Sequence, residues 1–268
     1  MSWLRSRRTV GLLIVPALVA IFFLVGRARD PYRIETTRSY LPPSIDAPFG
    51  TDALGRDMFA RTGYAAGLSL QVVLQSMLVS FVLALALGAI AGYTAGRWPD
   101  AAISWVISLL FTIPFILIVV AIFAVIEPTM NRAYLVIGCI GWAAPARLVR
   151  GEVMQVRASG YILAQRAYGF TNADVLFRSI LPASFLPALL SILYFLPELI
   201  GIEVGLAFFG LGAKPPTPTL GKLIYDGLSE FSVAWWLPLM PAAVLLMITL
   251  FFYRGTATFA AMKSQEMR

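Results

Sequence analysis

Apolar residues gather in six long runs that alternate with shorter polar segments. A helix of about 20 apolar residues is long enough to cross the hydrocarbon core of a bilayer. The pattern therefore predicts an all-α membrane protein with six transmembrane helices. The runs are residues 10–25, 68–93, 101–125, 133–148, 186–211 and 233–253.

Polar segments divide the chain into regions around these runs. We expect a cytoplasmic N-terminus at 1–8, a first span at 9–26, an extracytoplasmic loop at 27–66, a membrane core at 67–253 and a cytoplasmic tail at 254–268. Within the core, a polar loop at about 150–182 separates the fourth run from the fifth. The first run follows three arginines, which also describes a secretory signal. Gly26-Arg27-Ala28 is a poor cleavage site, so we expect an uncleaved span.

Composition agrees with a chain that lies in lipid. Hydrophobic residues make up 59% of the 268 positions and charged residues 13%, whereas soluble domains have about 25% charged residues. The net charge of +7 comes from arginines between apolar runs, and no basic tract typical of nucleic-acid binding is present. We therefore expect lipid contacts and no nucleic-acid partner.

The loop at about 150–182 sets the predicted orientation. It is basic, and cytoplasmic loops carry an excess of Lys and Arg near span ends. With this loop inside, the inner side holds twelve Lys or Arg and the outer side nine, six of them in the long first loop. Both termini are then cytoplasmic. The five arginines of the loop are Arg147, Arg150, Arg157, Arg166 and Arg178.

Several kinds of chemistry are excluded by missing residues. The chain has no histidine and one cysteine, Cys139, so it has no His-based triad or metal site and no internal disulfide. No Gly-rich turn ends in Gly-Lys-Ser/Thr, the phosphate-binding string of P-loop ATPases. We expect no enzymatic activity, no metal and no cofactor in this chain.

Small and acidic residues inside the spans are candidates for packing or for a translocation path. Gly88 and Gly92 in the second run and Gly96 just after it recur every four residues, and Gly201 and Gly205 do so in the fifth run. Such spacing lets helices approach closely, either within this chain or against a second membrane subunit. Two further candidates are carboxylates in the fifth run, where a charge is costly unless it faces protein or water: Glu198 and Glu203.

A helical corner is predicted in the basic loop. Residues before Gly169 favour helix, the glycine can end it, and Thr171 or Asn172 can cap the next helix. Two short helices meeting at a corner and projecting into the cytosol would suit docking to a soluble partner, although a plain surface loop is the alternative.

Three separated segments resemble the inner-membrane permeases of dipeptide and oligopeptide ABC importers, in particular the second of their two permease subunits. The match covers about residues 45–253. The first segment is 49–57 with Arg61 and 67–70, similar to the signature before the second helix. The second, 164–169 with 180–182, resembles a coupling loop. The third, Glu203 with 208–212 and 215–218, is similar to the end of the fifth helix.

The resemblance implies a type I ABC importer permease fold in the bacterial cytoplasmic membrane. It implies a second homologous permease subunit, two cytosolic ATPases that bind ATP and Mg, and an extracytoplasmic solute-binding protein. The candidates for ATPase coupling are Arg157, Tyr161, Ala164, Arg166, Gly169 and Asp174. The outer signature, which would shape the vestibule or the binding-protein dock, is Thr51, Asp52, Gly55, Arg56 and Asp57.

Two other functions stay open from the residues alone. An ABC importer permease could carry a solute other than a peptide. A protein of another class, an ion-coupled secondary transporter, could use Glu198 or Glu203 as its proton or cation site near the midplane. A membrane scaffold without transport activity would need only the spaced glycines.

Overall fold

A computed structural model describes residues 29–127 and 129–266, and for 130, 131 and 255–266 it describes the backbone alone. The N-terminal segment 1–8 and the predicted first span lie outside the described residues. The described part is almost entirely helical, and its only bridge of β type joins Thr51 to Asp57.

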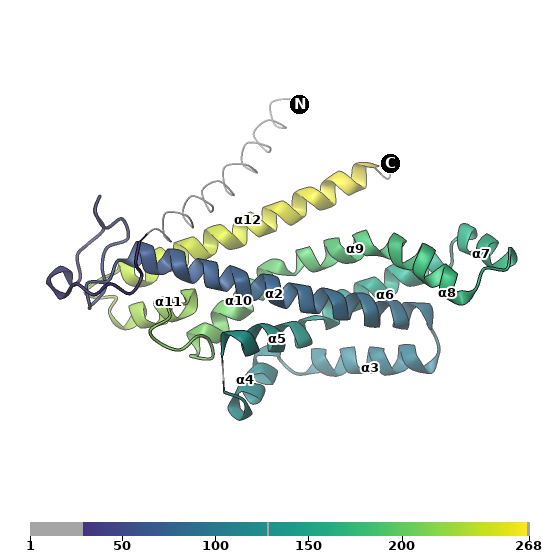
Figure 1. Ribbon diagram of the computed structural model, residues 1–268, viewed down its shortest axis with the longest axis horizontal. Coiled ribbons are helices and arrows are strands. Elements are labelled where there is room, and N and C mark those ends of the chain that lie inside the picture. Colours follow the sequence, from purple (N-terminus) through teal and green to yellow (C-terminus); the bar gives the residue numbers. More distant parts are fainter. Residues whose placement is uncertain (1–28, 128, 267–268) are drawn as a thin grey trace. The chain divides into compact units, whose positions relative to one another are not determined.

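Helices follow one another with short connections (Figure 1). In chain order they are the 3-10 helix η1 (Thr36–Arg38), α2 (Met58–Tyr93), α3 (Trp98–Thr112), α4 (Phe115–Val125), α5 (Met130–Gly141), α6 (Ala143–Arg157), α7 (Gly160–Ala167), α8 (Asn172–Val175), the π-helix η2 (Leu176–Ile180), α9 (Leu181–Tyr194), α10 (Leu196–Phe208), α11 (Leu220–Ser229) and α12 (Trp236–Glu266).

Three helical segments of the described chain are long and apolar enough to cross a membrane: Met58–Tyr93, Asn172–Tyr194 and Trp236–Arg254. The pair α3 and α4 would make a fourth, although the two are bent by 90° at the break between them. An all-helical membrane fold is confirmed. The count of six spans stays a prediction.

Three of the predicted runs are interrupted. The run 101–125 breaks before Pro114, 133–148 breaks at Trp142, and 186–211 breaks at Phe195. Proline explains the first and third breaks, because Pro114 and Pro197 have no N–H to donate to a carbonyl in the preceding turn. Hydropathy responds to the apolar side chains alone, so it reports such a run as one helix.

The boundary between the basic loop and the fifth run also differs from the prediction. α8, η2 and α9 form one continuous helical segment from Asn172 to Tyr194, which crosses the expected end of the loop at about 182. Pro182 lies at the first positions of α9 and follows a π-turn. The wider turn accommodates a residue that cannot donate a backbone hydrogen bond.

Two compact units make up the chain. Among the described residues, the first comprises 29–73, 127–133 without 128, and 200–266, and the second comprises 74–126 and 134–199. In the first unit, α11 packs closely on its neighbours through glycines. A Cβ on Gly221 would lie 2.1 Å from the Val204 carbonyl oxygen, and one on Gly227 would lie 2.6 Å from the Pro238 nitrogen. Only glycine permits these approaches.

The second unit has its core between α2 and α6. A Cβ on Gly88 would lie 2.7 Å from the Ala146 oxygen, and one on Gly92 would lie 2.6 Å from the Arg150 oxygen. The side chains of Val149 and Val153 also lie against these two positions, so the α2–α6 seam has no space for a side chain at either glycine. Around this seam lies a buried cluster that continues into α7, α8 and α9: Ala89, Val149, Val153, Ile162, Val175, Ile180 and Ala188.

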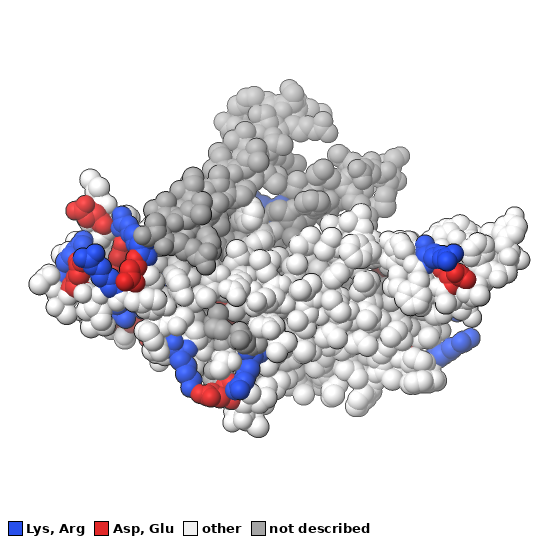
Figure 2. Space-filling view, viewed as in Figure 1, with Lys and Arg blue, Asp and Glu red and all other residues white. Residues whose placement is uncertain are grey.

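Charged atoms occupy only a few patches of the surface in Figure 2, and the area between them is uncharged. Large apolar side chains are exposed on α2, among them Leu78 at 62% and Val82 at 56%. In water such exposure would favour aggregation, whereas in lipid it needs no covering. The surface therefore supports the membrane assignment.

Candidate functional site

The corner between α7 and α8 is built by a glycine-ended helix. Gly169 has φ +84°, its N–H donates to the Arg166 carbonyl at 3.1 Å, and the N–H of Phe170 donates to the Gln165 carbonyl at 3.2 Å. These two bonds form a Schellman motif, which satisfies carbonyls at a helix end. The predicted glycine termination of α7 is confirmed.

A side-chain cap starts the next helix. Thr171 Oγ1 accepts the Asp174 N–H at 3.1 Å, and the same hydroxyl donates to Asp174 Oδ2 at 2.6 Å. The hydroxyl thus satisfies one of the free N–H groups at the helix start. Of the two caps that the sequence allowed, the structure uses Thr171. The corner is therefore fixed by local hydrogen bonds on both sides of Gly169.

Apolar contacts attach the corner to the second unit. Ile162 of α7 and Val175 of α8 are fully buried against Val149 and Val153 of α6. The opposite side of the corner is apolar but exposed. We call these exposed residues the tip; they are Tyr161, Leu163, Tyr168 and Phe170. Tyr168, at 85% exposure, is the most exposed of the four.

The six predicted coupling residues fall into two groups. Tyr161, Ala164 and Gly169 are exposed on the corner. The other three are partly buried and hold the corner in place: Arg157, Arg166 and Asp174. Sequence reasoning missed the role of Tyr93, which contacts both arginines. Its position at the end of an apolar run next to a basic loop was the available signal.

The outer segment before α2 is an ordered turn. Asp52 accepts backbone N–H groups from Leu54 and Arg56, each at 2.9 Å, and its Oδ2 pairs with Arg56 Nε at 2.7 Å. Asp57 accepts the Phe59 N–H at 2.8 Å, the geometry of a helix N-cap, and pairs with Arg29. The acids of the predicted signature therefore shape this turn.

Glycine is required at two positions of the same turn. Gly50 and Gly55 both have φ +70°. A Cβ on Gly55 would lie 1.8 Å from the Glu35 oxygen. Thr51 is buried, and its carbonyl accepts the Trp236 Nε1–H of α12 at 3.2 Å. The signature thus binds the outer segment to the start of the last helix within the first unit.

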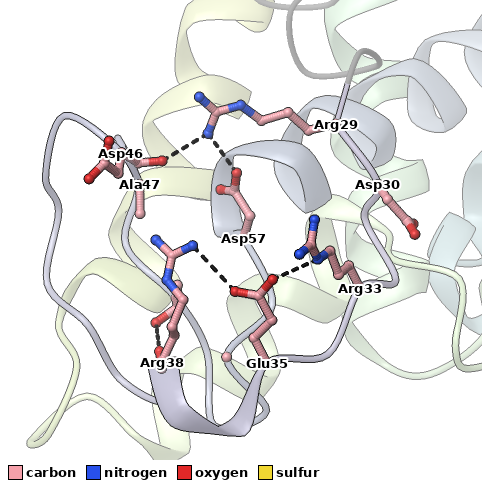
Figure 3. Close-up of a pocket in the computed structure, with 10 residues that line it drawn as sticks. Arg29, Asp30, Arg33, Glu35, Arg38, Asp46, Ala47 and Asp57 are labelled. Carbon is pink, nitrogen blue, oxygen red and sulfur yellow. Dashed lines mark hydrogen bonds and ion pairs between the residues drawn. The ribbon is translucent and has the colours of Figure 1, made fainter.

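A pocket of about 330 Å³ opens beside this turn (Figure 3). Ion pairs cross it: Arg29 contacts Asp57 at 2.8 Å, and Glu35 contacts Arg33 at 2.6 Å and Arg38 at 3.4 Å. A second pocket of about 240 Å³ lies in the same unit, where its lining includes Arg56 and Arg61. Both pockets are polar and carry charges of both signs.

The two intramembrane acids have different surroundings. Glu203 is 5% exposed on α10, and its Oε2 has no hydrogen-bond partner in the described structure. The Ser69 hydroxyl of α2 is buried beside it. Glu198, near the start of the same helix, is more exposed. These different environments argue against a single site in which both acids have the same role.

The spaced glycines also separate into two sets. Gly88 and Gly92 pack against α6, which confirms packing within the chain for this pair. A Cβ added to Gly201, Gly205 or Gly96 would meet no atom of the described structure within 4 Å. The α10 glycines therefore face open space in the described chain.

Comparison with known proteins gives the family. The family described as "Binding-protein-dependent transport system inner membrane component" matches residues 84–260. The dipeptide transport system permease protein DppC of Bacillus subtilis is 31% identical over 90% of this chain and 77% of its own length. The glutathione transport system permease protein GsiD of Pectobacterium atrosepticum is 32% identical over 90% of this chain and 80% of its own.

Solved structures give the same fold. An inward-facing MetNI methionine ABC transporter chain aligns with a TM-score of 0.60 at 19% identity, over 73% of this chain and 92% of the other. A chain of an amino acid ABC transporter crystallised with histidines aligns at 0.57 and 15% identity, over 73% and 92%. This family membership favours an ABC permease over an ion-coupled carrier or a scaffold. The chain belongs to the binding-protein-dependent transport system inner membrane components, the permease subunits of ABC transporters.

Proposed function

We propose that the chain is one of two channel-forming permease subunits of an ABC importer that carries di- or oligopeptides. The substrate class is supported by relatives whose names specify dipeptide, oligopeptide or glutathione transport. A non-peptide solute is the competing possibility. Uptake of peptides and of free amino acids by the complete transporter separates these two.

The proposed complex contains three further kinds of subunit. A second homologous permease completes the pore, two cytosolic ATPases bind ATP and Mg, and an extracytoplasmic binding protein delivers the solute. This chain lies in the bacterial cytoplasmic membrane with both termini in the cytosol. Energy for transport then comes from ATP-driven closure of the ATPase pair, which shifts the pore between two states.

The observation that best supports this function is the α7–α8 corner. Its turn is fixed by the Schellman bonds at Gly169 and the Thr171 cap, while the apolar tip stays exposed. Aromatic side chains on a rigid support are typical anchors of protein interfaces. We infer that the tip inserts into a groove of an ATPase subunit.

The outer turn at 50–57 is the proposed counterpart on the other side of the membrane. Its ordered backbone and the neighbouring charged pocket offer fixed cations and anions to the binding protein. Charge complementarity guides such transient docking. Glu198, the more exposed acid, is the better candidate for the translocation path, and the buried Glu203 is the better candidate for helix packing.

Co-purification of the ATPase tests the proposed docking. We expect Tyr168→Ala to remove an anchor and weaken ATPase retention on the permease complex about tenfold or more, as for a central interface aromatic. The matched control is Trp98→Ala, which removes a similarly exposed aromatic at the start of α3, outside the corner. Equal retention for both variants would show that the tip does not bind the ATPase.

A further inference from the structure

Tyr93 is the last residue of α2, and it contacts the ends of three other helices in the second unit. Its contacts are Arg157 at the end of α6, Arg166 in the last turn of α7 and Asn172 at the start of α8. These are the elements that form and support the corner. One side chain thus joins a membrane-spanning helix to the proposed ATPase contact.

The backbone of Tyr93 supplies the first connection. The last carbonyls of a helix have no partner within it, and basic side chains near this end are favourable. Arg157 Nη1 donates to the Tyr93 carbonyl oxygen at 2.6 Å. Because Arg157 also ends α6, this bond joins the final turns of α2 and α6.

The ring supplies the second connection. The guanidinium carbon of Arg157 lies 5.5 Å from the Tyr93 ring centroid, and that of Arg166 lies 5.9 Å from it. Both distances are within the range of cation–π attraction. Arg166 Nε is buried without a hydrogen-bond acceptor among the described residues. No oxygen in this part of the structure accepts a hydrogen bond from that nitrogen, so the Tyr93 ring partly compensates the charge of the Arg166 guanidinium.

The hydroxyl supplies the third connection. Tyr93 Oη donates to Asn172 Oδ1 at 2.8 Å. Asn172 begins the continuous helical segment that extends to Tyr194. Two membrane-spanning segments are therefore joined by one hydrogen bond at their ends beside the corner, between residues 79 positions apart in the chain.

We propose that Tyr93 is a positioning residue that makes α2 move together with the α7–α8 corner, so that motion of the bound ATPase reaches the pore. This inference rests on the proposed function. The Tyr93–Asn172 bond is its specific element, because it joins α2 directly to the helix that leaves the corner. Losing the bond should let the corner move without α2, and ATP would then be hydrolysed without import.

A double-mutant cycle in reconstituted complexes tests this role. The complete transporter is placed in proteoliposomes with a defined mixture of di- to pentapeptides, and the number of peptides imported per ATP hydrolysed is measured. Tyr93→Phe and Asn172→Ala should each lower this ratio about fivefold, the effect of one hydrogen bond. The double variant should lose no more than either single variant. ATPase retention should stay at the wild-type level in all three.

The control is Thr94→Val, which removes a neighbouring hydroxyl that bonds only within its own helical turn, to the Ile90 carbonyl at 2.7 Å. It should keep the wild-type ratio. The inference is overturned if Tyr93→Phe keeps that ratio or if the two single losses multiply in the double variant. A wild-type complex that retains no ATPase would instead refute the proposed function.

A distance measurement gives a readout that does not depend on the substrate. Spin labels replace the exposed Val82 of α2 and Phe177 of η2 in a Cys139→Ser background. In the otherwise wild-type complex, addition of ATP and vanadate should leave the distance between the two labels unchanged, because α2 and the corner move together. Tyr93→Phe should make that distance depend on nucleotide. A distance that changes equally in both proteins contradicts the proposal.

Discussion

Arg150 binds both carboxylate oxygens of Asp100, with Nε 2.6 Å from Oδ1 and Nη2 2.9 Å from Oδ2. Asp100 is 5% exposed and also accepts the Gly96 N–H at 3.0 Å and the Ser104 hydroxyl at 3.2 Å. The pair connects the start of α3 to α6 across 50 positions of sequence. It places an arginine of the basic loop in a structural role.

Removing one partner of this pair should destabilise the second unit. We expect Asp100→Ala to lower the free energy of unfolding by about 2–3 kcal/mol, because the half-buried Arg150 loses a bidentate partner. The measurement is the thermal unfolding midpoint in detergent. A double variant, Asp100→Ala with Arg150→Met, should recover part of the loss. A single variant as stable as the wild type would show that the pair contributes little.

The two glycine sets should respond differently to the same added methyl group. Gly92→Ala should lower stability by about 1–3 kcal/mol, because its Cβ would approach the Arg150 carbonyl and force α2 from α6. Gly205→Ala has open space in the described chain, so its stability should stay at the wild-type level. Thermal unfolding of both variants in the same detergent measures the difference, and equal midpoints would contradict it.

Assembly with the second permease provides the complementary measurement for these glycines. If a partner helix packs on the α10 glycines, Gly205→Leu should reduce recovery of the two-permease complex, while Gly151→Leu, at an exposed and equally open site of α6, should not. Normal recovery of both variants would show that the second permease does not pack on these glycines.

Local features of the corner could be predicted from the sequence, whereas long-range contacts could not. Gly169 and Thr171 act on residues within five positions, so their roles follow from chain order. Tyr93 meets its partners 64 and 79 positions away, and an apolar run that ends in tyrosine gives no information about them. Pro197 indicates a bend in the fifth run, whereas the break before Pro114 was missed because an apolar average does not register a single proline.

In the outer signature and in α10, too, the sequence does not reveal contacts between residues far apart in the chain. The need for glycine at position 55 comes from its φ of +70° and from the backbone of Glu35, which lies 20 positions earlier, and the sequence alone shows neither. The burial of Glu203 and the greater exposure of Glu198 depend on which face of α10 meets other helices. Helix geometry places the two acids about 140° apart in one apolar run, but the sequence does not show which of the two faces is buried.

Glu127 and Lys214 form an exposed ion pair in the first unit. The hydrogen bond from Lys214 lowers the pKa of Glu127 below its usual value. A lowered pKa means that the pair contributes stability above the unfolded-state pKa of Glu127 and loses it as the pH falls through the lower folded-state value. Lys214→Met should therefore move the Glu127 titration to higher pH.

Carbon-13 NMR of glutamate-labelled protein in micelles measures this shift, and Glu127→Gln assigns the resonance. The control is Lys222→Met, because Lys222 pairs with Asp226 and should leave the Glu127 titration unchanged. Equal titration midpoints for the wild type and Lys214→Met would contradict the pairing.

The side of the membrane on which the α7–α8 corner lies tests the proposed function most directly. In a Cys139→Ser background, Tyr168→Cys places a single thiol at the most exposed position of the tip. In membranes from cells that express the permease without its ATPase, a membrane-impermeant maleimide should label it in inverted vesicles and permeabilised cells but not in intact cells. Labelling in intact cells would place the corner outside, where no cytosolic ATPase could bind it.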